Sequence, residues 1–267
     1  MKIAFAGKGG VGKTTIAAVL VRLLAESNRR VLAVDADPNS SLAPFLGFGD
    51  SKKIIPISEM KDLIYERMGV DPKERASFYK LNPKIDDIPD RFKLTSGRVS
   101  LIVMGTVDAG GSGCVCPESK FLKELISHLV LERDEDIVMD MEAGLEHLGR
   151  ATAGAMGSSV VVVEPSYSSV ETALRIKKLA SDIRLKAYFL GNKIRSSKDE
   201  DFIYSALPKD LVLGMVPYDE DINSAGRDAA ALGNLGRKAN RVVQAVSKIK
   251  EGLLNKEKDI EQKKIAG

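Results

Sequence analysis

The chain has 267 residues, of which 44% are hydrophobic and 29% charged, an ordinary balance for a soluble globular protein. This length suits one large α/β domain that needs no disulfide or metal staple. The net charge of +3 is too small to indicate nucleic-acid or membrane binding. No apolar stretch reaches the roughly 18 residues of a membrane span, and the first residues lack a secretory layout. We therefore expect a cytoplasmic protein whose two cysteines stay reduced.

Short apolar runs alternate with longer helical patterns along the chain. Runs that are apolar nearly throughout are typical of parallel strands covered on both faces. The expected strands are 2–6, 31–35, 100–104, 136–140, 159–163, 187–192 and 211–215, and the expected helices are 13–27, 118–132, 168–183, 197–206 and 235–254. This alternation predicts an α/β fold, a doubly wound and mostly parallel sheet with helices on both faces.

Two segments break this rhythm within a single expected domain, residues 1–267. The segment from about 51 to 97 is charged and contains four prolines, so we expect an insertion with short helical pieces. The tail from about 251 to 267 is rich in lysine and glutamate and is expected to be a frayed helix end. Its apolar positions are too few for a good amphipathic membrane anchor.

Residues 7 to 15 read G-K-G-G-V-G-K-T-T and fit the phosphate-loop pattern G-x-x-x-x-G-K-[ST] between a strand and a helix. Glycines bring backbone amides close to phosphate oxygens, and the following helix adds its positive end. We expect Lys13 to neutralise the β- and γ-phosphates and the Thr14 hydroxyl to bind Mg²⁺. The predicted nucleotide-binding residues here are Gly7, Lys8, Gly9, Gly10, Val11, Gly12, Lys13, Thr14 and Thr15. The alternative is a glycine-rich turn whose lysine has no role. It is disfavoured because all four fixed positions of the pattern match and the loop lies between an expected strand and an expected helix.

Aspartates end two of the expected strands. Asp35 and Asp37 lie at the end of the second strand, where ligand sites of open α/β sheets occur. We expect Asp35 to face the phosphate loop and its magnesium shell. Asp140 ends another strand and is followed by Gly144, a spacing that suits a loop contacting the γ-phosphate. Strand-end aspartates that only form turns are the alternative for the first pair.

Cys114 and Cys116 lie in a glycine-rich segment that leads into a helix. Thiolates at a helix N-terminus have a lowered pKa, which favours metal binding. One C-x-C pair supplies two ligands where a closed site takes four, so a two-fold dimer would complete a Zn²⁺ or Ni²⁺ site. Buried packing cysteines are the alternative, although glycines are poor core material. Of the two histidines, His128 is expected in a helix as a surface or boundary residue, and His147 is left open between a surface position and a role in nucleotide sensing or metal binding.

Lys8 gives the phosphate loop a second lysine. This resembles the deviant loop of the nitrogenase iron protein, septum-site-selecting and plasmid-partition ATPases, in which that lysine reaches the partner's nucleotide across a dimer. Together with the segments 35–39, 113–118 and 139–147, the chain looks like the nickel-maturation ATPases of the CooC type. The resemblance extends over most of the chain, to about residue 226.

The resemblance implies a Mg²⁺-dependent ATPase that acts as a homodimer and delivers Ni²⁺ or Zn²⁺ to carbon monoxide dehydrogenase or acetyl-CoA synthase. It implies that Lys8, Lys13 and Asp37 are catalytic, with Asp37 orienting the attacking water, and that Asp140 holds Mg²⁺ through a water. It also implies that Asn192 reads adenine and that Pro217 lies against the base. Guanine-specific relatives usually carry an aspartate two residues after a lysine at this place, so Asn192-Lys193 indicates ATP.

Some neighbouring functions are disfavoured. Ala143 stands in the segment after Asp140, where the nitrogenase iron protein has a cysteine, and the chain has no third cysteine. Both observations argue against an electron-transferring [4Fe–4S] protein. The second hypothesis is a positioning or partition scaffold whose state is switched by the bound nucleotide. It accounts equally well for the phosphate loop and for the segments 35–39 and 139–147. It predicts binding to membrane or DNA, which the weak terminal helix and the lack of a basic cluster disfavour. A non-catalytic regulatory module is the third alternative. The insertion carries no motif that matches the CooC-type proteins, so the sequence does not identify the client enzyme.

Overall fold

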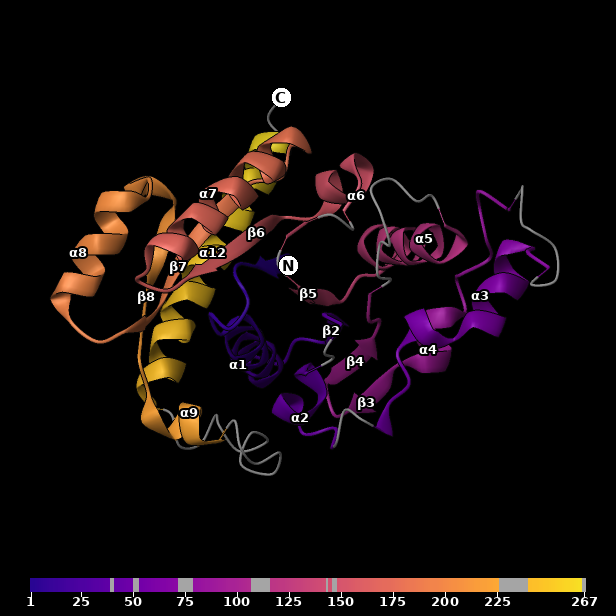
Figure 1. Cartoon of the computed structure of the whole chain (residues 1–267), viewed down its shortest axis with the longest axis horizontal. Helices are drawn as coiled ribbons and strands as arrows, with labels where there is room; N and C mark the ends of the chain where they lie inside the picture. The colour runs from indigo at the N-terminus through magenta and orange to yellow at the C-terminus, as the bar shows by residue number, and fades with distance from the viewer. Residues whose placement is uncertain are drawn as a thin grey trace.

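The computed structural model describes residues 1–38, 41–49, 53–71, 79–106, 116–142, 144–145, 148–225 and 240–265. Within them the strands form one eight-stranded sheet in the order β3-β4-β2-β5-β1-β6-β7-β8 (Figure 1). The bounds are β1 Lys2–Ala6, β2 Val31–Ala36, β3 Leu94–Ser96, β4 Val99–Val103, β5 Asp136–Met141, β6 Ser158–Val163, β7 Ala187–Ile194 and β8 Val212–Pro217. All pairs are parallel except β3 with β4.

Helices cover both faces of this sheet. One face carries α1 Lys13–Glu26, α2 Leu42–Leu46 and α12 Asn240–Ile265. The opposite face carries α3 Lys61–Met68, α4 Ile88–Phe92, α5 Pro117–Glu132, α6 Arg150–Ala155, α7 Tyr167–Asp182 and α8 Ser197–Ala206 (Figure 1). The remaining described elements are α9 Glu220–Ala225 and the 3₁₀ turns Ile57–Glu59 and Lys209–Leu211. The doubly wound α/β fold expected from the sequence is therefore confirmed.

The strand side chains divide the core into two apolar layers. In β1, Ile3 and Phe5 pack toward α1, whereas Ala4 and Ala6 face the α5 side. Successive side chains of a strand point to opposite faces, so an apolar residue at every position supplies both layers. The interiors of the strands are therefore filled with apolar side chains, and polar side chains stand at the carboxyl ends, where ligand sites of open α/β sheets occur.

The expected insertion contributes to this core. Ile57, Ile64, Met68 and Ile88 are fully buried in the layer beneath α5. The short strand β3 was not predicted, because three residues are too few to show an alternating pattern. The other strand ends match the prediction or differ from it by one or two residues.

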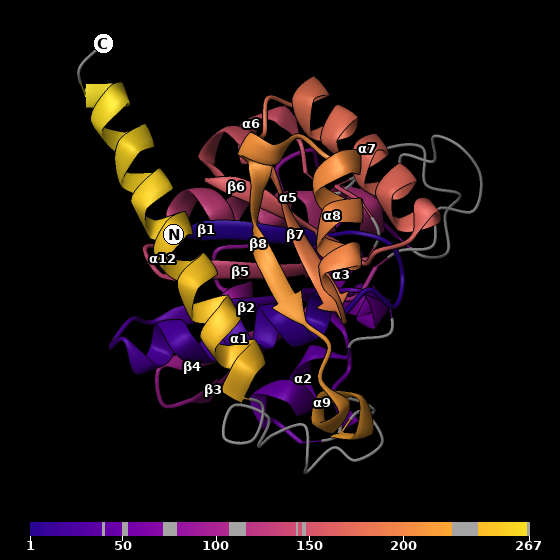
Figure 2. The ribbon, with the colours of Figure 1, turned by 90° about the vertical axis from the view of Figure 1, so that its left-hand side faces the viewer.

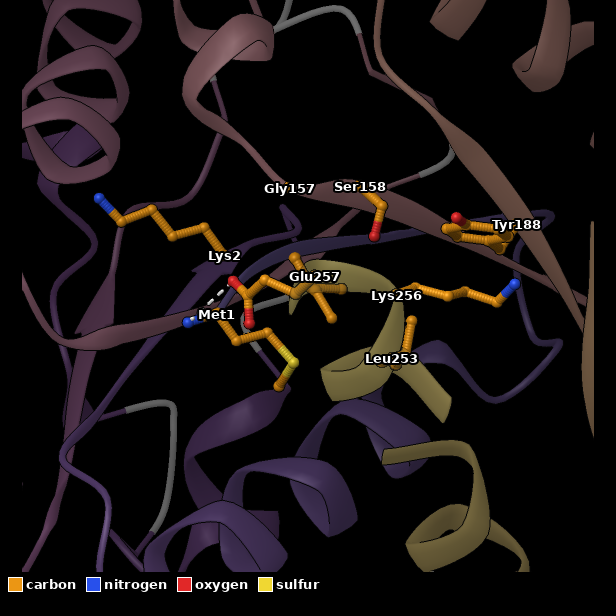
Figure 3. A pocket seen from close by; sticks show the side chains of 9 residues that line it. Met1, Lys2, Gly157, Ser158, Tyr188, Leu253, Lys256 and Glu257 are labelled. Atoms are coloured by element: carbon orange, nitrogen blue, oxygen red, sulfur yellow. Dashed lines mark ion pairs between the residues drawn. The ribbon is translucent and has the colours of Figure 1, made fainter. Parts of the chain in front are cut away.

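The helix that the sequence predicted over residues 235–254 continues in α12 as far as Ile265, so the charged tail is helical to that residue. Leu253 is buried against the sheet, Glu257 lies 3.2 Å from the amino group of Met1, and Lys256 lies over the ring of Tyr188 (Figure 3). These contacts hold the middle of α12 on the domain, while its last turns project beyond it (Figure 2). None of the helices in the described ranges is both long and apolar enough to cross a membrane.

Candidate functional site

The phosphate loop joins β1 to α1 in a conformation that requires glycine. Gly7 and Gly12 have φ angles of +139° and +97°, in the region that L side chains rarely adopt. A Cβ atom at Gly7 would collide with the backbone carbonyl of Val162, and one at Gly12 with the side-chain amide of Asn192. The loop therefore lies against the ends of β6 and β7, and any side chain at these two positions would push it away.

Lys13 is held inside the loop. Its side chain is 6% exposed, and its ammonium donates to the carbonyl oxygens of Gly7 at 3.1 Å and Lys8 at 3.4 Å. Burial lowers the pKa of Lys13, while the nearby carboxylates of Asp140 and Asp37 oppose that shift. A buried cation surrounded by backbone groups is a ready partner for phosphate oxygens.

Asp35 and Asp140 lie side by side, because they are register partners in the parallel pair β2–β5. The carboxylate of Asp35 accepts the backbone amides of Leu42 at 2.8 Å and Asp37 at 3.3 Å, so it anchors the start of α2. Burial raises the pKa of Asp35 to about 6. Asp35 thus ties the segment after β2 to the centre of the site.

Asp140 is completely buried, and neither of its carboxylate oxygens has a hydrogen-bond partner among the described residues. The neighbouring Thr14 hydroxyl opposes part of the increase in the pKa of Asp140 that burial causes. Burial raises the pKa of Asp140 to about 7, and the negative charge of Asp35 adds to this effect. An orphaned carboxylate beside a threonine hydroxyl is the donor set that Mg²⁺ and its water shell would satisfy, so these residues fit that ion.

Lys8 points away from the loop interior. Its ammonium donates to the hydroxyl of Ser168, in the first turn of α7, at 2.8 Å, and this contact is exposed to solvent. Thr14 and Ser41, which lies just before α2, bring their hydroxyls within 3.4 Å of each other. The two lysines of the loop are therefore separated: Lys13 faces inward and Lys8 faces the surface at α7.

Asn192 and Lys193 both hold the loop from β7. The side-chain amide of Asn192 donates to the carbonyl of Val11 at 2.7 Å, and the Lys193 ammonium donates to that of Gly10 at 2.7 Å. Lys193 also forms a 3.1 Å ion pair with Glu164, which follows β6. The sequence predicted no role for Lys193 or Glu164, because the side chains of a regular strand alternate, so Lys193 and Asn192 would point to opposite faces of the sheet.

A cavity of about 230 Å³ opens beside the loop. Its lining includes Gly12, Thr15, Asn192, Pro217, Tyr218 and Asn223. Asn192 and Pro217, both expected at the base, thus line the same cavity, next to the loop that would hold the phosphates. The size and the mixed lining suit the base and ribose of a nucleotide.

Cys116 caps the N-terminus of α5, where its sulfur accepts the amide of Ser119 at 3.4 Å. Two residues further on, Glu118 accepts a 2.7 Å hydrogen bond from Tyr65 of α3, so the insertion contacts the start of this helix. His128 is half-buried in α5. Cys114, Ala143 and His147 lie outside the described residues. The part of the chain that the structure describes holds no cluster of three or more metal-binding side chains.

A glycine-turned phosphate loop, a buried lysine, paired strand-end aspartates and an adjoining cavity define a P-loop nucleotide-binding protein of the α/β class. The chain belongs to the family of CobQ/CobB/MinD/ParA nucleotide-binding domains, whose family model matches residues 2–231. This membership assigns it an ATP-binding function.

The chain is similar to several known proteins. It is 45% identical to the ATP-binding protein MJ0823 of Methanocaldococcus jannaschii over 83% of this chain and 87% of that one. It is 42% identical to the carbon monoxide dehydrogenase accessory protein CooC of Rhodospirillum rubrum over 84% of this chain and 86% of that one. Its fold matches MinD from the Aquifex aeolicus MinC:MinD complex with a TM-score of 0.65 at 18% identity, covering 95% of each chain. A ParA family ATPase from Chlorobium tepidum gives a TM-score of 0.65 at 18% identity over 95% of this chain and 98% of that one.

Proposed function

We propose that this chain is an ATP-driven metallochaperone. It binds and hydrolyses ATP with Mg²⁺ as a homodimer and assists nickel insertion into carbon monoxide dehydrogenase or acetyl-CoA synthase. The observation that carries this proposal is the 42% identity to a carbon monoxide dehydrogenase accessory protein over 84% of the chain. The solved structures under 25% identity support the fold only, so they do not favour the partition-scaffold alternative.

In this proposal the nucleotide lies across the phosphate loop with its base in the adjoining cavity. Lys13 contacts the β- and γ-phosphates. The Thr14 hydroxyl, and Asp140 through a water molecule, would hold Mg²⁺, which would neutralise charge on the phosphates. Asp37 orients a water molecule for attack on the γ-phosphorus, which yields ADP and inorganic phosphate. Positioning and charge stabilisation account for most of such a reaction.

Dimer closure is the step that couples ATP to metal. Lys8 is partly exposed and donates a solvent-exposed hydrogen bond to Ser168, so it can leave this contact and reach the nucleotide of a second copy. Closure would bring Cys114 and Cys116 of both copies together as four thiolate ligands for the metal cargo. Hydrolysis would reopen the dimer and release the metal to the client enzyme.

Metal stoichiometry tests the proposal. One metal shared by four thiolates predicts about half an equivalent of Ni²⁺ or Zn²⁺ per chain in the nucleotide-bound dimer. The double variant Cys114→Ser/Cys116→Ser should lose this metal and keep ATP binding, because neither residue belongs to the phosphate loop of residues 7 to 15. Unchanged stoichiometry in the double variant would defeat the proposal. Clear ATP-dependent co-sedimentation with DNA or liposomes would favour the scaffold instead.

A further inference from the structure

The insertion packs beside the helix that begins at the cysteine-bearing segment. Its helix α3 lies against α5, whose N-terminus is capped by Cys116 (Figure 1). Ile64 and Met68 of α3 are fully buried in the apolar layer that also holds Phe121 and Leu125 of α5. This packing fixes where the rest of α3 stands relative to the first turn of α5.

Tyr65 of α3 reaches this first turn. Its hydroxyl donates to Oε1 of Glu118 at 2.7 Å. Glu118 stands two residues after Cys116, whose side chain reaches the same carboxylate. Burial would raise the pKa of Glu118, but hydrogen bonds from Tyr65, from its own backbone amide and from Cys116 lower this pKa overall. Glu118 therefore connects Tyr65 to the side chain that carries the sulfur.

The sulfur of Cys116 is thus oriented by groups of the described chain. It accepts the backbone amide of Ser119 at 3.4 Å, while Glu118 holds the same side chain from within the first turn. Partners of a metal-binding side chain fix its orientation, and the loss of one typically lowers metal affinity by about 10- to 100-fold. Tyr65 stands one step further out, because it holds the carboxylate that contacts Cys116.

The insertion also contacts the chain before residues 107–115, which lie outside the described residues. The backbone amide of Ser58 donates to the carbonyl of Met104 at 2.9 Å, and a Cβ atom at Gly105 would collide with the side chain of Ser58. The amides of Met104 and Gly105 both donate to the backbone carbonyl of Asp35, at 2.8 and 3.2 Å. The insertion therefore holds the chain on both sides of residues 107–115, and one side is tied to the nucleotide site.

We propose that Tyr65 is a positioning residue for metal binding, which through Glu118 holds the Cys116 side chain in the orientation that binds the metal cargo. The insertion, which carries no recognisable motif, thereby acts as the support of the cysteine-bearing segment. This inference rests on the proposed binding of metal by the cysteines.

Ni²⁺ titration of the full chain tests it, in the presence of a non-hydrolysable ATP analogue and with a chromophoric chelator as competitor. Tyr65→Phe keeps the ring and removes only the hydroxyl. It should weaken Ni²⁺ binding about tenfold. Recorded without the chelator, the sulfur-to-Ni²⁺ charge-transfer absorption of the bound metal should also change. The affinity for the ATP analogue should stay as in wild type, and thermal denaturation verifies that each variant is folded.

Two further variants separate a positioning role from a general effect on the fold. If Tyr65 acts through Glu118, Tyr65→Phe should weaken Ni²⁺ binding by less than about twofold when it is added to Glu118→Ala. Tyr204→Phe is the matched control, because it removes the hydroxyl of a partly exposed tyrosine on α8, at the opposite end of the sheet from α3 (Figure 1). It should leave Ni²⁺ binding unchanged.

The outcomes distinguish this inference from the proposed function. Ni²⁺ affinity and absorption as in wild type for Tyr65→Phe, an equal effect of Tyr204→Phe, or an undiminished effect of Tyr65→Phe in Glu118→Ala would overturn the inference and leave the metallochaperone proposal standing. A folded wild type that binds neither Ni²⁺ nor Zn²⁺, or a Cys116→Ser variant that binds them as wild type does, would remove both.

Discussion

Replacing Asp140 with asparagine removes a buried carboxylate that has no hydrogen-bond partner among the described residues. Burial raises the pKa of this group from its ordinary value of 3.8 to about 7. Between these two values the folded chain binds more protons than the unfolded chain. The free energy of unfolding therefore falls as the pH rises from about 4 to about 7 in the protein without Mg²⁺ and nucleotide.

The size of this effect follows from the same two pKa values. Linkage gives a loss of about 3 kcal/mol of stability between pH 5 and pH 8 from Asp140 alone. Asparagine does not titrate, so the Asp140→Asn variant should lose about 3 kcal/mol less than wild type over this range. Asp35, whose pKa burial raises to about 6, is present in both proteins, so it contributes the same pH dependence of the free energy of unfolding to each.

Urea denaturation at pH 5 and pH 8, without Mg²⁺ and nucleotide, measures the difference. Asp134→Asn is the control, because Asp134 is exposed just before the same strand. The burial argument would be refuted if the free energies of unfolding of wild type and Asp140→Asn changed between pH 5 and pH 8 by the same amount to within about 0.5 kcal/mol. If Asp140 also serves Mg²⁺ as proposed, the Asp140→Asn variant should lose ATP hydrolysis by about 100-fold or more.

Two further predictions concern the lysines around the loop. Lys8→Ala should keep nucleotide binding but lose ATP-driven dimerisation, whereas Ser168→Ala, which removes only the partner of Lys8 within the chain, should still dimerise. Size-exclusion chromatography with light scattering, with and without a non-hydrolysable ATP analogue, measures this, and a dimer of Lys8→Ala would contradict it. Lys193→Met should weaken ATP binding about fivefold, because a partly exposed charged hydrogen bond to the loop carbonyl of Gly10 contributes about 1 kcal/mol. Titration calorimetry of ATP binding tests this prediction, with Lys198→Met, at an exposed position of α8, as the control. Equal ATP affinities in the two variants would contradict a role of Lys193 in holding the phosphate loop.

Several features of this protein were readable from local patterns. The alternation of apolar strands with helices predicted the doubly wound fold, because burial on both faces leaves a continuous apolar run in each strand. The phosphate loop was predictable because its glycines and Lys13 stand within nine consecutive residues. Asp35 and Asp140 were found as candidates because each stands at the end of an apolar run, and parallel strands bring such ends to one edge.

Other features depended on which strands become neighbours, and no local pattern encodes that. Lys8 and Ser168 are 160 residues apart, and they meet because β1 and β6 pair in parallel. Lys193 reaches Gly10 only because the irregular end of β7 breaks the alternation of side chains. The length of α12 was missed as well, since its charged sequence has few apolar positions and its middle is held by contacts with Met1 and Tyr188.

The sequence by itself determined the class of fold and the chemistry of the phosphate loop, because both follow from residue order within short segments. The tertiary structure decided the rest of the site. It oriented Lys8 toward α7 and brought Tyr65 of the insertion onto Glu118 at the start of α5. It also left Asp140 buried without a partner among the described residues. These properties arise from burial and from contacts between distant segments, which exist only once the sheet has formed.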